Sequence, residues 1–132
     1  MNTKNLPDYR LKQKILYIDQ TNPQILESYG DAFFSEGNLS DALDFYQKAN
    51  SVIGLQKIKK VAMESGDVML FAHAAKALNL ELKTSDWENI AKIAINLKKY
   101  LFARHALEKA SNEDLLNSLK QTMQVEEHEK NS

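Results

Sequence analysis

The three histidines carry the broadest catalytic and metal-binding chemistry in this chain, because imidazole can transfer protons or ligate zinc. His73, His105 and His128 lie far apart, and no two have the spacing of three or four residues that brings two ligands to one helix face. The chain has no cysteine, which excludes thiolate metal sites and cysteine nucleophiles. We therefore expect no metal site, and we expect ordinary surface or half-buried histidines.

Paired carboxylates can act as a general acid and base, and Asp41 and Asp44 form such a pair on one predicted helix. We expect this pair to be a solvated helix face. No glycine-rich phosphate loop is present, because Gly30 and Gly37 belong to a helical hairpin, and no serine has a nucleophile-elbow motif around it. The sequence predicts neither an enzyme nor a cofactor.

Nucleic-acid binding is a further alternative, because helical repeats can bind single-stranded RNA. Two clusters of basic residues could contact phosphates: Lys57, Lys59 and Lys60, and then Lys98, Lys99, Arg104 and Lys109. The first repeat, in contrast, is acidic, with Glu27, Asp31, Glu36, Asp41 and Asp44. Since the net charge is −1, nucleic acid is a less favoured partner.

The composition is that of one globular domain over residues 1–132, with 43% hydrophobic and 27% charged residues. The N-terminal ten residues lack the apolar core of a secretory signal. No window approaches the roughly 20 apolar residues that cross a bilayer. We expect a cytoplasmic protein without membrane contact, and a charged C-terminal stretch, 126–132, that frays.

The elements expected to hold these residues are all helical. Both prolines lie early, at Pro7 and Pro23, and no segment shows sustained strand-like alternation. We expect eight helices: 8–19, one opened by Asn22-Pro23 and ending near 37, one from about 40 to 51, 55–65, one from 67 to about 82, 84–98, one ending at 110, and a terminal helix capped within 111–114.

An internal repeat is the strongest pattern in the chain. At an offset of 61 residues, large apolar residues match large or medium ones and small residues match small ones, except for Phe33 and Ala94. We expect Gly30 and Ala42 to let the two helices of a hairpin approach closely. The matched sets are Leu26, Tyr29, Gly30, Phe33, Leu39, Ala42, Tyr46 and Ala49, and Trp87, Ile90, Ala91, Ala94, Tyr100, Ala103, Leu107 and Ala110.

The segment 29–49 resembles the tetratricopeptide repeat family, and 87–110 fits the same pattern with Lys98 at the usual turn glycine. The resemblance covers about three degenerate hairpins over residues 23–110. It implies an α-solenoid of antiparallel helical hairpins. Lys59 and Phe71 stand where the family has small residues, and the intervals from Leu26 to Leu55 and Trp87 are shorter than the family period of about 34. We expect an irregular middle hairpin with a different tilt.

These observations predict repeat units at 23–53, 54–83 and 84–110. Such a stack leaves apolar faces bare at both ends. We therefore expect capping helices at 8–20 and 111–126. An alternative for the first helix is a detachable basic arm.

In tetratricopeptide proteins the first helix of each hairpin lines a concave groove that holds a partner peptide. The resemblance places an apolar stripe there, and an acidic end followed by lysines suggests a ligand that is basic toward one terminus. Acidic C-terminal tails of heat-shock chaperones are disfavoured, because Glu27 and Asp31 would repel them. The predicted groove residues are Glu27, Asp31, Phe34, Gln56, Lys60, Met63, Glu88, Lys92 and Ile95.

The favoured hypothesis is a non-enzymatic adaptor or scaffold that binds a protein or peptide segment in this groove. Alternatives are a structural α-solenoid element that self-assembles, a protein similar to three-repeat secretion chaperones, and, less favoured, an RNA binder. The same stripe could instead merely pack against neighbouring hairpins. The sequence does not decide between monomer and homo-oligomer.

Overall fold

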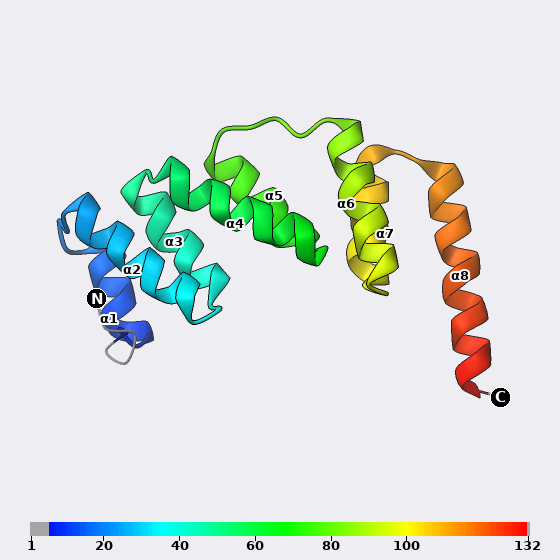
Figure 1. Ribbon diagram of the computed structural model, residues 1–132, viewed down its shortest axis with the longest axis horizontal. Coiled ribbons are helices and arrows are strands. Elements are labelled where there is room, and N and C mark those ends of the chain that lie inside the picture. Colours follow the sequence, from blue (N-terminus) through cyan, green and yellow to red (C-terminus); the bar gives the residue numbers. More distant parts are fainter. Residues whose placement is uncertain (1–5, 132) are drawn as a thin grey trace.

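The computed structural model describes residues 6–131, and over this range the chain forms helices and no strands (Figure 1). The prediction of an all-α fold is confirmed. The helices in this range are α1 (Tyr9–Tyr17), α2 (Pro23–Ser35), α3 (Leu39–Ala49), α4 (Val52–Ser65), α5 (Val68–Ala77), α6 (Thr84–Asn96), α7 (Tyr100–Ala110) and α8 (Glu113–Asn131).

Side-chain caps determine where several helices begin. The Asp8 carboxylate accepts a hydrogen bond from the Leu11 N–H at 2.9 Å, and the Asn22 side chain accepts one from the Gln24 N–H at 2.7 Å. At α5, the Asp67 carboxylate accepts from the Leu70 N–H at 3.1 Å. Each bond satisfies a donor that the first helical turn leaves without a backbone partner.

The helices form consecutive pairs, α2 with α3, α4 with α5, and α6 with α7, arranged in a row. The first helices of neighbouring pairs contact one another, α2 with α4 and α4 with α6, and the second helices do the same. Helix α1 contacts α3 and α8 contacts α7, so these two helices occupy opposite ends of the elongated molecule (Figure 1).

The 61-residue repeat reappears in the bounds of the helices. Residues 23–35 of α2 correspond to 84–96 of α6, and residues 39–49 of α3 correspond to 100–110 of α7. Helices α2 and α6 therefore have the same length, and so do α3 and α7. The backbone repeats at the same offset as the apolar pattern.

Backbone turns extend the repeat to the middle pair. Gly37, Gly66 and Lys98 follow the first helix of each pair, with φ of 78°, 67° and 59°. The turns after the second helices are also left-handed, at Asn50, Asn79 and Ser111, with φ of 54°, 58° and 55°. In both sets the sequence intervals are 29 and then 32 residues, the intervals that separate Leu26, Leu55 and Trp87.

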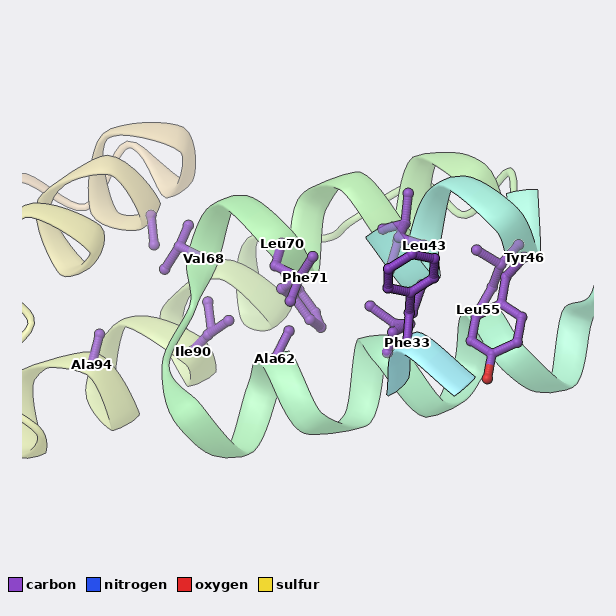
Figure 2. Packing of buried hydrophobic residues seen from close by; sticks show 14 of the residues in the cluster. Phe33, Leu43, Tyr46, Leu55, Ala62, Val68, Leu70, Phe71, Ile90 and Ala94 are labelled. Atoms are coloured by element: carbon purple, nitrogen blue, oxygen red, sulfur yellow. The ribbon is translucent and has the colours of Figure 1, made fainter. Parts of the chain in front are cut away.

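One hydrophobic cluster runs through all three pairs (Figure 2). Phe33, Leu43 and Tyr46 of the first pair and Leu55 of the second belong to it, and the cluster continues past Phe71 toward the third pair. Of the predicted repeat-packing residues, Tyr29, Ala49 and Trp87 are half-buried against this cluster, and Leu26, Gly30, Phe33, Ala42, Tyr46, Ile90, Ala91, Ala103, Leu107 and Ala110 are buried.

The role expected for Gly30 needs a correction. The nearest atoms to a Cβ built at Gly30 belong to the ring of Tyr46, at 2.6 Å, and not to Ala42. The missing side chain therefore makes room for an aromatic ring. Gly54 on α4 also makes room for that ring, and a Cβ built there would lie 2.2 Å from it.

Three helix bounds differ from those expected by three residues or more. Helix α4 begins at Val52, because the side chain of Ser51 accepts a hydrogen bond from the Gly54 N–H. Helix α5 ends at Ala77, five residues early, because Asn79 adopts a left-handed conformation and the Leu80 N–H bonds back to the Ala75 carbonyl at 2.9 Å. Residues 126–131, expected to fray, continue α8.

Candidate functional site

The predicted groove residues lie on α2, α4 and α6, the first helices of the three pairs, and all retain exposed surface. We call these nine residues the first-helix face. Its exposed members are Asp31, Gln56, Lys60 and Lys92, and its half-buried members are Glu27, Phe34, Met63, Glu88 and Ile95.

The apolar members of this face occupy equivalent places in the repeat. Phe34, Met63 and Ile95 are each half-buried and pack against the core while keeping part of their surface accessible. The ammonium of Lys57 lies 4.7 Å from the centroid of the Phe34 ring, which joins α2 to α4 at this surface. Such a cation–π contact contributes about 0.5–1 kcal/mol at an exposed site.

A surface hollow of about 440 Å³ lies on α4 and brings together three of the predicted residues, Gln56, Lys60 and Met63. Its floor is formed by Phe71 of α5, which is buried, and the ammonium of Lys59 lies 5.7 Å from that ring. The lysine and phenylalanine that depart from the family pattern therefore contact each other. The hollow therefore combines the apolar Met63 and Phe71 with two lysines, Lys59 and Lys60, and one carboxylate, Glu64.

Asp31 is engaged within the protein. Its carboxylate accepts a hydrogen bond from the Tyr46 hydroxyl at 2.5 Å and lies 3.4 Å from the Lys57 ammonium. Burial and the Asp31 hydrogen bond raise the pKa of Tyr46 well above its usual range. The acidic end of the face therefore depends chiefly on Glu27. Sequence reasoning missed Lys57 as the partner of Asp31, because the two residues are 26 apart.

The acidic pair Asp41 and Asp44 lies on a partly solvated helix face, with 38% and 36% of the side-chain surface exposed, and it also binds a cation. Lys12 of α1 is buried and donates to both carboxylates, at 2.5 and 2.8 Å. Burial lowers the pKa of Lys12, but hydrogen bonds and charge from the two aspartates outweigh it and raise the pKa overall. With Ile15 and Leu16 buried beside it, this charge cluster holds α1 against α3.

Several members of the two basic clusters have partners within the chain. Lys57 pairs with Asp31, the Lys99 ammonium donates to the Ser65 carbonyl at 2.5 Å, and Arg104 donates to Glu108 at 3.0 Å. These contacts use part of the positive charge that phosphates would require.

The histidines do not converge on a metal site. His73 and His128 are exposed, and half-buried His105 meets the Trp87 ring edge-on at 6.3 Å between centroids. Across residues 6–131, no group of three or more histidines and carboxylates is placed to hold a metal ion. Over the same range no helix is long and apolar enough to span a bilayer.

No family model, curated protein or solved structure matches the chain.

Proposed function

We propose that this chain is a non-enzymatic interaction module that binds an extended or helical segment of a partner protein along the first-helix face. The observation that carries the proposal is the half-buried stripe of Phe34, Met63 and Ile95, which repeats across α2, α4 and α6 beside exposed charges. Partly exposed apolar groups with a polar rim are what a peptide-binding surface requires.

The proposal includes a tetratricopeptide-like α-solenoid with α1 and α8 as its capping helices. Two observations support it. Both sets of left-handed turns are separated by 29 and then 32 residues, and equivalent helices of neighbouring pairs contact one another. A scaffold or adaptor in the cytoplasm fits this reading, and the absence of cysteine is compatible with it.

Charge gives the partner a polarity. Glu27 lies on α2, whereas Lys60 and Lys92 hold one equivalent place on α4 and α6. We expect a partner segment with a basic residue near α2 and acidic residues over α4 and α6, with apolar side chains between them. Charge complementarity of this kind sets orientation and specificity more than affinity.

A selected peptide provides the test. We would screen a random dodecapeptide library against the full chain and measure the affinity of a selected peptide by calorimetry. Lys60→Glu with Lys92→Glu is expected to weaken binding about tenfold or more. The matched control, Lys76→Glu with Lys120→Glu, places the same charge change on exposed positions of α5 and α8. Equal loss in both variants, or selection of no binding peptide, contradicts the proposal.

A further inference from the structure

Helix α1 binds to the outer surface of α3 through one side of the helix. The buried residues of α1 are Lys12, Ile15 and Leu16, at the three- and four-residue spacings that place side chains on one helix face. The ammonium of Lys12 donates to both Asp41 and Asp44 of α3. The surface of α3 under α1, which we call the α3 face, therefore already holds an amphipathic helix with one cation and two apolar side chains.

Helix α1 is a weakly held occupant of the α3 face. It has nine residues, and isolated helices shorter than about 12 residues are marginal in water, so it depends on α3 for its helical structure. It packs mainly on α3, whereas each of α2 to α7 contacts more than one other helix. Both aspartates are partly exposed, which limits the strength of their ion pairs with Lys12.

Helix α1 also leaves part of the α3 face uncovered, at a surface hollow of about 430 Å³. The hollow is lined by Leu16 and Tyr17 of α1 and by Asp44, Gln47, Lys48 and Asn50. Because Lys12 meets Asp41 and Asp44 and the hollow follows further along both helices, α1 and α3 run in the same direction. Helix α1 ends at Tyr17, since the chain then turns toward α2. A longer helix without this turn would continue into the hollow.

The charges of α3 determine which helix fits there. Its charged residues are Asp41, Asp44 and Lys48. If α1 leaves, the two aspartates lose their cation, and their mutual repulsion favours a basic ligand at that place. Lys48 is exposed beside the hollow, so a second basic residue is disfavoured there.

We infer that the α3 face is a second interaction surface, at which a helix of another protein, with a basic residue followed by apolar residues three and four positions later, displaces α1. Helix α1 then acts as an internal competitor, because the partner binds only the fraction of molecules whose α3 face is open. The first-helix face takes no part in this exchange. The inference therefore does not depend on the proposed function.

A helical probe peptide tests the exchange. The probe is an alanine-rich helix with lysine, isoleucine and leucine at the spacing of Lys12, Ile15 and Leu16, continued for two further turns, and fluorescence anisotropy measures its affinity for the full chain. Lys12→Met weakens the docking of α1 and is expected to bind the probe about tenfold more tightly than the wild type. Lys14→Met, at an exposed position of α1, is the matched control and should bind like the wild type.

A second probe with methionine in place of the lysine isolates the charge contact. The Lys12→Met protein is expected to bind the lysine probe about tenfold more tightly than the methionine probe. When Asp41→Asn and Asp44→Asn are added to Lys12→Met, the two probes should bind equally. Circular dichroism of each variant checks that the helices are retained.

Hydrogen exchange determines where the probe binds. In wild-type protein saturated with the lysine probe, the α1 amides are expected to lose protection while the other helices keep theirs. Failure of the lysine probe to bind Lys12→Met, equal affinity of that protein for both probes, or bound probe with α1 still protected each overturns the inference. A wild-type dimer that is lost in Lys12→Met would identify α1 of a second copy as the occupant, and this result overturns it as well.

Discussion

The ring of Tyr46 on α3 occupies the space where Gly54 on α4 has no side chain. A Cβ at Gly54 would lie 2.2 Å from the ring, and a Cβ at Gly30 on α2 would lie 2.6 Å from it. The ring is fully buried, and its hydroxyl reaches Asp31. One tyrosine therefore joins the first helix pair to the second, and two glycines make this possible.

Gly54→Ala is expected to destabilise the protein by about 1–2 kcal/mol. Alanine favours the helix by about 1 kcal/mol over glycine, but forcing a fully buried ring to move costs about 1–3 kcal/mol or more. Urea unfolding followed by circular dichroism measures the difference. Gln56→Ala, at an exposed position of the same helix, controls for helix propensity and should be neutral or slightly stabilising. A Gly54→Ala protein as stable as the wild type would show that the ring can shift freely.

Tyr46→Phe is expected to lower the free energy of unfolding by about 1 kcal/mol at pH 7, because it removes the hydroxyl that donates a hydrogen bond to the charged Asp31 carboxylate. The Asp31 side chain is 55% exposed, so water can partly replace the lost hydrogen bond and the destabilisation stays smaller than for a buried charged acceptor. The pKa of Tyr46 is raised above its ordinary value of 10.0. Its contribution is therefore complete below pH 10.0 and declines as the pH rises toward the folded-state pKa.

The difference between wild type and Tyr46→Phe should accordingly shrink as the pH rises above 10. Urea unfolding at pH 7, 9, 10 and 11 provides the measurement. Tyr17→Phe, which removes the hydroxyl of an exposed tyrosine, is the control. A difference that is constant over this range would mean that Tyr46 ionises equally well in the folded protein.

Local pattern was sufficient to predict most of the helices. The 61-residue match between Leu26 and Trp87, and its continuation to Ala49 and Ala110, predicted two pairs whose bounds repeat at that offset. The end of α5 was predicted too late, because Leu78 and Leu82 keep the four-residue spacing of a helix although Asn79 has left the helix. Apolar periodicity is insensitive to a single left-handed residue.

Partners distant in sequence could not be predicted. Lys12 meets Asp41 and Asp44 across 29 and 32 residues, and no local spacing in the sequence indicates that this lysine is their partner. Phe71 was predicted to disturb a position reserved for small residues. It is instead buried, with Lys59 of the facing helix over its ring. How a large residue is accommodated at a position that usually holds a small one depends on its neighbours in the folded protein. A single sequence does not identify those neighbours.

Lys12→Met is expected to destabilise the protein by about 1–3 kcal/mol. The methionine keeps the apolar stem but leaves two adjacent carboxylates without their cation, and this costs more than losing a surface ion pair and less than exposing a fully buried charge. Asp41→Asn with Asp44→Asn in the same background should restore much of the loss, because the repulsion is removed.

Hydrogen exchange of the α1 amides locates the effect of Lys12→Met, since undocking of α1 raises exchange there before the rest of the molecule opens. Lys14→Met, at an exposed position of α1, is the control and should leave exchange unchanged. Wild-type exchange and stability in Lys12→Met would show that Ile15 and Leu16 alone hold the helix.

Lys98→Gly is expected to stabilise the protein by about 0.5–1 kcal/mol. Lys98 has φ of 59° at a turn where the other two pairs have Gly37 and Gly66, and a left-handed conformation costs a residue with a Cβ about 1–2 kcal/mol. Part of this gain is lost because glycine makes the unfolded chain more flexible.

The reciprocal change, Gly37→Lys, should destabilise by a similar amount. A Cβ at Gly37 would have no atom within 4 Å, so its cost is conformational. Urea unfolding measures both changes, as a shift of the midpoint with no change in the dependence of the unfolding free energy on urea concentration. If Lys98→Gly is less stable than the wild type, the Lys98 side chain itself must stabilise the turn.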